Sequence, residues 1–324
     1  MELRAAAPLS LRISVTSRCQ LRCRYCAPAE GAPQPLPGST MTSDEILKFV
    51  RTLARHYPLR KVHLTGGEPL TRPGVVDLVA GLAREGGADL ALTTNGQRLA
   101  AMAAGLRRAG LARINISLDS LSAETYRRLT RGASLAPVIA GIEAARQAGF
   151  APIKLNMVVL RGVNDHEVTD VARWGLERGC QVRLLELMPI GVARPHFDEW
   201  FVPTADVQEQ LGAAFDLRPI AGDGGSSSRN FLARSPSGGA SGIIGFISPC
   251  SDSFCAGCRR LRLTADRRLL GCLAQPAGVN IRDALRAAGA ECEARLVAAV
   301  EAALGLKRAG RRFAAQGPMI AVGG

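Results

Sequence analysis

The residues best suited to chemistry in this chain are three closely spaced cysteines, Cys19, Cys23 and Cys26, in the stretch SRCQLRCRYCAP. A structural zinc site takes four ligands in a tetrahedron, and the neighbouring sequence offers no histidine or further cysteine. Thiolates also hold iron–sulfur clusters, and a cubane held by three of them leaves one iron free to bind a small molecule. The spacing therefore favours a 4Fe-4S cluster with an open iron; a three-coordinate zinc ion and redox-active thiols are the alternatives.

A second group of cysteines lies near the C-terminus, where Cys255, Cys258 and Cys272 are spaced C-x2-C-x13-C. Spacing alone allows two interpretations, a zinc ribbon completed by Cys250 or a second three-cysteine site. Because six of the nine cysteines fall into two tight groups, metal or cluster binding is favoured over disulfides. Burial as a small apolar side chain is the simplest expectation for the other three: Cys180, Cys250 and Cys292.

Short apolar runs alternating with helical patterns must position these cysteines. Six runs read as strands, at residues 11–15, 61–65, 89–94, 112–118, 153–159 and 182–188. Helical patterns cover residues 43–56, 74–85, 98–109, 122–130 with 136–148, and 166–178. Thr42 to Glu45 reads as a capping box before the first helix. The alternation implies right-handed βαβ crossovers, so we predict an α/β fold, a partial (β/α)6 TIM-type barrel of parallel strands with a C-terminal extension.

In barrels of this kind the chemistry lies at the carboxyl ends of the strands. The notable residues here do follow predicted strands: Cys19 to Cys26, then Gly66-Gly67-Glu68-Pro69, then Asn95-Gly96, and finally Met188. We therefore expect them to share one site.

The alternation stops after residue 189, which predicts two domains, the barrel over 1–190 and a C-terminal region over 191–324. Glycine and serine dominate residues 221–242, so we expect a flexible loop over 220–242. Two further helical patterns follow, at 280–288 and 291–306.

The net charge of +13 does not identify a partner, because only four of the 41 basic residues are lysines and this bias looks like codon usage. The first residues contain no apolar signal-peptide core, and no run of about 18 apolar residues occurs anywhere. We therefore expect a cytoplasmic protein.

The first cysteine group and the Gly66-Gly67-Glu68-Pro69 loop together resemble the radical S-adenosylmethionine (SAM) enzymes, in which C-x3-C-x2-C follows the first barrel strand. The resemblance implies that SAM binds the open iron and that its reductive cleavage gives a 5′-deoxyadenosyl radical. The positions that match this family's SAM contacts are Tyr25, Gly67, Ser117 and Met188.

The second group, followed by Arg260-x-Arg262 and by a terminal Gly323-Gly324, resembles the GTP 3′,8-cyclase family (molybdenum cofactor biosynthesis protein A) over residues 11–324. This resemblance implies a lyase that converts GTP to (8S)-3′,8-cyclo-7,8-dihydroguanosine 5′-triphosphate in the first step of molybdopterin biosynthesis. It also implies a second 4Fe-4S cluster on Cys255, Cys258 and Cys272 that binds the guanine. Catalytic roles are implied for Arg260, Arg262, Gly323 and Gly324. The positions that match GTP contacts are Arg12, Lys61, His63, Thr93, Lys154, Arg183, Arg260 and Arg262.

Two positions depart from the family pattern. His63 stands where the family usually has arginine, and Ser17 replaces a common aspartate. A neutral imidazole offers one donor where a guanidinium offers five and a fixed charge, so either a neighbour such as Lys61 compensates or phosphate binding is weaker. The resemblance also implies an electron donor such as flavodoxin or ferredoxin, a downstream cyclic pyranopterin monophosphate synthase, and a second copy of the chain as a homodimer partner.

Two other functions fit part of the sequence. A radical SAM enzyme that matures a peptide with an auxiliary cluster usually has more cysteines in the auxiliary region and lacks Arg260-x-Arg262 and the terminal glycines. A zinc-bearing nucleic-acid binder suits the positive charge, but the Gly66-Gly67 loop and the low aromatic content of 4% argue against it.

Overall fold

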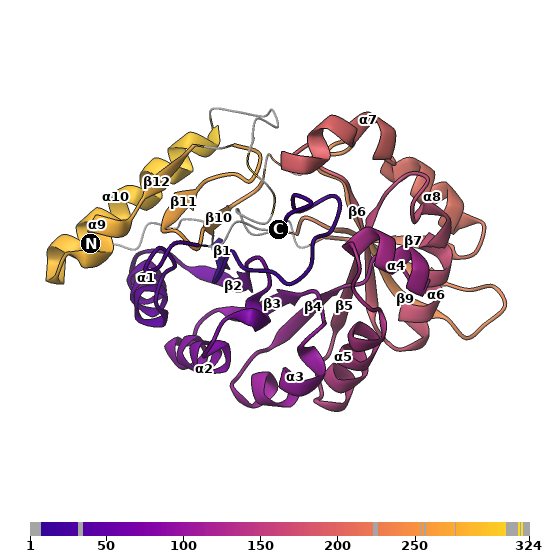
Figure 1. The fold of residues 1–324 in the computed structure, drawn as a ribbon, viewed down its shortest axis with the longest axis horizontal. Coiled ribbons are helices and arrows are strands. Elements are labelled where there is room, and N and C mark those ends of the chain that lie inside the picture. Colours follow the sequence, from indigo (N-terminus) through magenta and orange to yellow (C-terminus); the bar gives the residue numbers. More distant parts are fainter. Residues whose placement is uncertain are drawn as a thin grey trace.

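One continuous sheet of twelve strands organises the computed structural model, which describes residues 8–31, 35–222, 226–253, 255, 257–275, 277–308, 317 and 319. Six parallel neighbours form its middle, in the order of the chain (Figure 1). These six are the strands that the sequence predicts, so the partial α/β barrel is confirmed. Their bounds are β1 (Leu9–Ser14), β2 (Leu59–Thr65), β3 (Asp89–Thr94), β4 (Arg113–Ser117), β5 (Ile153–Val159) and β6 (Gln181–Glu186).

Helices cover the outer face of the curved sheet (Figure 1). The first begins at the predicted capping box, where Thr42 Oγ1 accepts from Glu45 N at 3.1 Å and Glu45 Oε2 accepts from Thr42 N at 2.7 Å. The predicted helices all form, with ends within two residues of those expected. They are α1 (Ser43–His56), α2 (Val75–Glu85), α3 (Leu99–Arg108), α4 (Ala123–Thr130), α5 (Ala136–Gln147) and α6 (Val168–Glu177), with short 3-10 turns η1 (Pro69–Thr71) and η2 (Asp165–Glu167).

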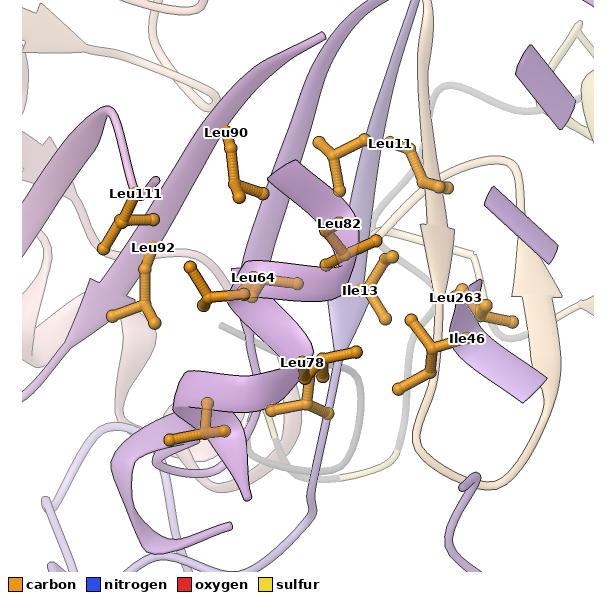
Figure 2. Packing of buried hydrophobic residues seen from close by; sticks show 14 of the residues in the cluster. Leu11, Ile13, Ile46, Leu64, Leu78, Leu82, Leu90, Leu92, Leu111 and Leu263 are labelled. Carbon is orange, nitrogen blue, oxygen red and sulfur yellow. The ribbon is translucent and has the colours of Figure 1, made fainter. Parts of the chain in front are cut away.

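Alternation along each strand separates an apolar face from a polar one. Leu11 and Ile13 of β1 are fully buried in one cluster with Leu64 of β2. Figure 2 shows Leu78 and Leu82 of α2 packed among these side chains. Each such burial stabilises the fold by about 1.5–3 kcal/mol. If the pairing register of a strand shifted by one residue, its apolar face would turn toward the interior of the barrel, here called the lumen. The apolar layer therefore also fixes which polar side chains point into the lumen.

The C-terminal region extends both edges of the barrel sheet. At one edge β10 (Arg260–Leu263) lies parallel to β1, and at the other β9 (Ser241–Ile247) lies parallel to β6. Antiparallel partners continue each edge: β11 (Arg268–Leu270) and β12 (Gly278–Asn280) beyond β10, and β8 (Arg229–Arg234) and β7 (Asp216–Ile220) beyond β9. The division at residue 190 stays a prediction, and the sheet itself runs through both regions.

The predicted flexible loop over 220–242 is wrong for residues 229–234, which form β8, and for the start of β9. Leu232 pairs with Ile243 across this hairpin, and the rings of Phe231 and Phe246 meet edge to face with centroids 5.4 Å apart. Glycine- and serine-rich segments on either side of β8 hid its pairing with β7 and β9, and β9 is held to the barrel by the distant strand β6.

Helices complete the C-terminal region, and two of them confirm the predicted patterns at 280–288 and 291–306. The structure has them as α9 (Arg282–Arg286) and α10 (Gly289–Arg308), after η3 (Gly191–His196), α7 (Phe197–Trp200) and α8 (Thr204–Gly212). None of the helices among the described residues has the length and apolar character needed to span a bilayer.

Candidate active site

A cavity of about 210 Å³ lies at the carboxyl ends of the barrel strands. Half of the site residues predicted from the sequence line it together. From the predicted set these are Arg12, Cys19, Cys23, Tyr25, Cys26, Gly67, Thr93, Ser117, Arg183 and Met188. Met319, close to the C-terminus, lines the same cavity. The predicted catalytic residues Gly323 and Gly324 lie outside the described residues.

The first cysteine trio lies on the loop after β1. Burial raises the pKa of Cys19 to about 11 and that of Cys26 to about 12, and it raises the pKa of Cys23 as well. Three partly buried thiols side by side are poor anions unless a cation joins them, and bound metal ions deprotonate coordinating thiols outright. The donor set therefore fits an iron–sulfur cluster bound at this wall of the cavity.

Residues 66–68 pack directly on the start of the cysteine loop. Gly67 N donates to Thr16 O and Glu68 N donates to Arg18 O, each at 2.7 Å. A Cβ at Gly67 would lie 2.7 Å from Ser17 O and would collide with Arg18 O. Glycine is required here by this close approach, so the loop is held in register with the cysteines.

Glu68 is buried beneath this contact and organises the end of β3. Its carboxylate accepts from Leu70 N at 2.9 Å, Thr94 Oγ1 at 2.7 Å and Asn95 N at 2.7 Å. Burial outweighs these bonds and raises its pKa to about 7. Asn95 in turn donates to Cys19 Sγ at 3.7 Å. The sequence interpretation gave Glu68 no separate role, although it lies in the quoted motif.

Tyr25 reaches across the cavity to a residue that sequence reasoning missed. Its hydroxyl donates to Asp119 Oδ2 at 2.7 Å, and Val158 N donates to Asp119 Oδ1 at 2.9 Å. Burial raises the pKa of Asp119 to about 6 despite both bonds. Asp119 lies two residues after Ser117 in the stretch INISLD, so its position after a strand was the available signal. The pair ties the cysteine loop to β4 and β5.

Cations crowd the lumen below the cysteines, on alternate positions of the strands. Four of these cations were predicted from the sequence: Arg12, Lys61, Lys154 and Arg183. A fifth, Arg113, lies near them and was missed by the sequence reasoning. Burial first, and then Arg183 and Lys61, lowers the pKa of Lys154 to about 7. Burial, Arg260 and Arg183 lower that of Arg12 to about 10.

Asp89 is the acid that opposes these cations, 3.0 Å from Arg113 Nε and 3.6 Å from Lys61 Nζ. Asp89 acts on three of the five cations, Lys61, Lys154 and Arg113, so the described part of the partly desolvated lumen keeps an excess of positive charge. Such a site is suited to a multiply charged anion, whose oxygens guanidinium groups can bind in pairs.

His63 lies within this cationic wall as a neutral ring. Burial, then Arg12 and Lys61, lowers its pKa well below the usual value. Its Nε2 is 2.7 Å from Thr93 Oγ1 and 3.3 Å from Asn115 Nδ2. The imidazole therefore links β2, β3 and β4 and adds no charge to the anion site.

The second cysteine group flanks the β10–β11 hairpin. The pairing of Arg262 with Leu270 puts Cys258, before β10, and Cys272, after β11, beyond the same end of the hairpin. Cys255 is exposed one turn away, with Cys258 N donating to Cys255 O at 3.2 Å. Burial opposes ionisation of Cys258, but Arg260 and Lys307 outweigh it and lower its pKa to about 7. Cys258 is thus predisposed to act as a thiolate ligand.

Cys250 is engaged elsewhere, because its Sγ donates to Leu187 O at 3.4 Å and its N–H to Glu186 Oε2 at 3.0 Å. Burial raises its pKa to about 12. Cys180 and Cys292 are buried as expected. Within the part of the chain that the structure describes, no three His, Cys, Asp or Glu side chains converge on the position of a single ion. A cluster does not need such convergence, because its thiolates bind different irons.

Arg12 links the two cysteine groups. Its backbone pairs with Arg262 on one side and His63 on the other. The side chain lines the cavity of the first trio, and it lies near enough to Cys258 and Arg260 for both to affect its pKa. Arg12 thus lies between the two thiol groups, while Cys255, Cys258 and Cys272 are not among the described residues that line the cavity of the first trio.

Comparison with known proteins identifies both halves of the chain. Residues 13–175 match the radical SAM superfamily and residues 180–313 match the family described as Molybdenum Cofactor Synthesis C. The GTP 3′,8-cyclase of Geobacter sulfurreducens is 43% identical over 274 residues, which cover 84% of this chain and 82% of that protein. That of Moorella thermoacetica is 41% identical over 303 residues, or 92% of this chain and 91% of that protein.

Among solved structures, Streptococcus suis SuiB bound to S-adenosylmethionine superposes with a TM-score of 0.57 at 15% identity. The match covers 86% of this chain and 65% of SuiB, less than two thirds of its length. At this identity the likeness concerns the fold alone.

Proposed function

Because the chain belongs to the radical SAM superfamily and, within it, to the GTP 3′,8-cyclases, we propose that its two cysteine groups and the cations between them convert GTP to (8S)-3′,8-cyclo-7,8-dihydroguanosine 5′-triphosphate. The enzyme is a radical SAM lyase of molybdenum cofactor biosynthesis. The position of Arg12, between the two cysteine groups and within the anion site, is the observation that carries the assignment of substrate to this cavity.

Cys19, Cys23 and Cys26 would hold the cluster that binds SAM, and Cys255, Cys258 and Cys272 the cluster that binds the guanine. When bound, the first cluster and SAM supply one-electron chemistry that removes a hydrogen atom from ribose carbon 3′ of GTP. The protein contributes position: Gly67 offers close backbone, Ser117 and Met188 line the cavity, and the Tyr25–Asp119 bond fixes the cysteine loop. Holding both reactants in one cavity makes the encounter nearly intramolecular.

The lumen cations would hold the triphosphate. Arg12, Lys61, Lys154 and Arg183 provide the charge, while His63 and Thr93 provide neutral hydrogen-bonding groups. Arg113 adds a positive charge that offsets the absence of one at position 63, in addition to the compensation expected of Lys61. A bound anion would raise the pKa of Lys154, so that its ammonium form is the binding form.

Arg260 and Arg262 would position the guanine end of the substrate near the second cysteine group. Both lie on β10 directly after Cys258, and Arg260 Nε donates to Cys258 Sγ at 3.3 Å. We propose that the terminal Gly323 and Gly324 enter the site, and the proposal is supported by Met319, four residues before Gly323, which lines the cavity. Residues without side chains suit entry into a crowded pocket.

The remaining partners are part of the same proposal. A one-electron donor such as flavodoxin or ferredoxin would reduce the clusters, and cyclic pyranopterin monophosphate synthase would consume the product. Free thiols at all nine cysteines suit a reducing compartment such as the cytoplasm, with a homodimer as the assembled form. The likeness to SuiB supports the alternative of a peptide-maturing enzyme only as far as the fold is shared.

The test is an anaerobic assay of reconstituted protein with dithionite and SAM, in which 5′-deoxyadenosine is measured. We expect its formation to rise on adding GTP and to stay at the basal level with ATP, whose base lacks the guanine groups. No rise with GTP, in protein shown to contain both clusters, contradicts the substrate assignment.

A further inference from the structure

We infer that Lys307, near the end of α10, is a positioning residue of the second cluster site, where its ammonium group donates to the sulfur of Cys258 and supports the cluster's negative charge. The inference rests on the proposed function, because it takes Cys258 to be a cluster ligand. It assigns a role to one of only four lysines in the chain.

Two contacts define the position of the ammonium group. Lys307 Nζ lies 3.1 Å from Cys258 Sγ and 2.8 Å from Arg260 O. A charged donor to a thiolate is a strong hydrogen bond, and Arg260 Nε provides a second one to the same sulfur at 3.3 Å. Cys258 thus receives two cationic donors, Arg260 from the strand that follows it and Lys307 from a helix, 49 residues away in sequence.

The packing around α10 brings the lysine to this point. Val300 and Ala303 of α10 are buried in the same cluster as Leu269 of β11. At Gly271, which precedes Cys272, an added Cβ would collide with Ala303 O and lie 3.1 Å from Lys307 Cβ. The missing side chain at Gly271 therefore allows the helix to approach the cysteine hairpin closely.

The double contact argues for more than helix anchoring. A lysine that only anchors a helix can donate to carbonyls, and Lys48, within α1, does so in the same region: its Nζ donates to Leu285 O at 2.8 Å and to Ala287 O at 2.9 Å. Both of its partners are carbonyls at the end of α9. Lys48 thus anchors the C-terminal helices without touching a cysteine, which makes it a matched control.

The effect on the cluster follows from charge. Hydrogen bonds to the sulfurs and the net charge of a cluster set its reduction potential, and a cation at the sulfur stabilises the reduced, more negative form. Removal of the ammonium should therefore make the second cluster harder to reduce. Loss of the link to Arg260 would also loosen the strand that presents Arg260 and Arg262 to the substrate.

The experiment isolates the second cluster in full-length protein carrying Cys19→Ala, Cys23→Ala and Cys26→Ala, reconstituted anaerobically. The midpoint potential is followed by electron paramagnetic resonance in four proteins: this background, and the background with Lys307→Met, Lys307→Arg or Lys48→Met. At the midpoint of the background protein, we expect Lys307→Met to lower the ratio of reduced to oxidised cluster about tenfold, a shift of about 59 mV for one electron. Lys307→Arg, which keeps the positive charge, should leave the midpoint close to that of the background protein. Lys48→Met should leave it unchanged.

Several outcomes overturn the inference. If Lys307→Met has full iron and sulfide content and an unchanged midpoint potential, the role of Lys307 is refuted and the proposed function is unaffected. An equal shift in Lys48→Met would assign the effect to anchoring of the helices. If Lys307→Met does not fold, Lys307→Gln, which keeps a neutral donor, must show a lowered midpoint. A background protein without iron and acid-labile sulfide overturns this inference and the proposed function together.

Discussion

Gly67→Ala tests how the structure connects the Gly66-Gly67 loop to the cysteine loop. The added Cβ would collide with Arg18 O and approach Ser17 O to 2.7 Å, and both obstacles are backbone atoms that cannot rotate away. Overpacking of this kind costs about 1–3 kcal/mol. The two backbone hydrogen bonds that join the loops, from Gly67 N and Glu68 N, are each worth about 1 kcal/mol. If both break, the free energy of unfolding should fall by about 3–5 kcal/mol.

The assay is anaerobic guanidinium unfolding of the cluster-free protein, with SAM binding measured by calorimetry after reconstitution. Displacement of the loop should also weaken SAM binding at least about tenfold, or 1.4 kcal/mol. Gly212→Ala at the end of α8 is the matched control, because nothing lies within 4 Å of the added Cβ, and it should change stability by less than about 1 kcal/mol. Wild-type stability together with wild-type SAM affinity in Gly67→Ala would refute the close-approach argument.

Two further predictions concern the Tyr25–Asp119 hydrogen bond and the lumen cation Lys154. Tyr25→Phe removes the donor to the buried Asp119 carboxylate and should weaken SAM binding, measured by calorimetry, about tenfold. The same change in an Asp119→Ala background should reduce SAM affinity much less. An equal loss of affinity in both backgrounds would show that the hydrogen bond is not the cause. Because burial lowers the pKa of Lys154 to about 7, the free protein loses the binding ammonium as pH rises through that value, and GTP affinity should fall from about pH 6 to about pH 8. Lys154→Met should weaken binding about tenfold at the lower pH and reduce this dependence, and an unchanged pH profile in the variant would exclude Lys154 as its source.

Local patterns predicted the barrel well because each βα unit carries its own signals. The capping box at Thr42 sets the start of α1 through contacts three residues apart, and the apolar alternation of β1 sets its buried face. The cysteine loop and the Gly66-Gly67 loop were expected to meet because parallel strands end at one edge of the sheet. The first two features depend on short separations in sequence, and the third follows from the regular order of parallel strands.

What the sequence did not reveal depends on pairing between distant residues. Strand β8 pairs with β7 before it and β9 after it, but these strands join the barrel only where β9 lies along the distant strand β6, so the glycine- and serine-rich surroundings of β8 read as a loop. Asp119 acquires its role from a tyrosine 94 residues earlier, and Lys307 from a cysteine 49 residues earlier. Such contacts become visible only when the strands are placed side by side.

The central claim is that GTP and SAM are held together in the cavity at the strand ends. It is tested most directly with GTP carrying deuterium at ribose carbon 3′, followed by mass spectrometry of the 5′-deoxyadenosine formed. We expect the recovered 5′-deoxyadenosine to contain deuterium from the substrate. Formation of unlabelled 5′-deoxyadenosine alongside consumed GTP would contradict the account.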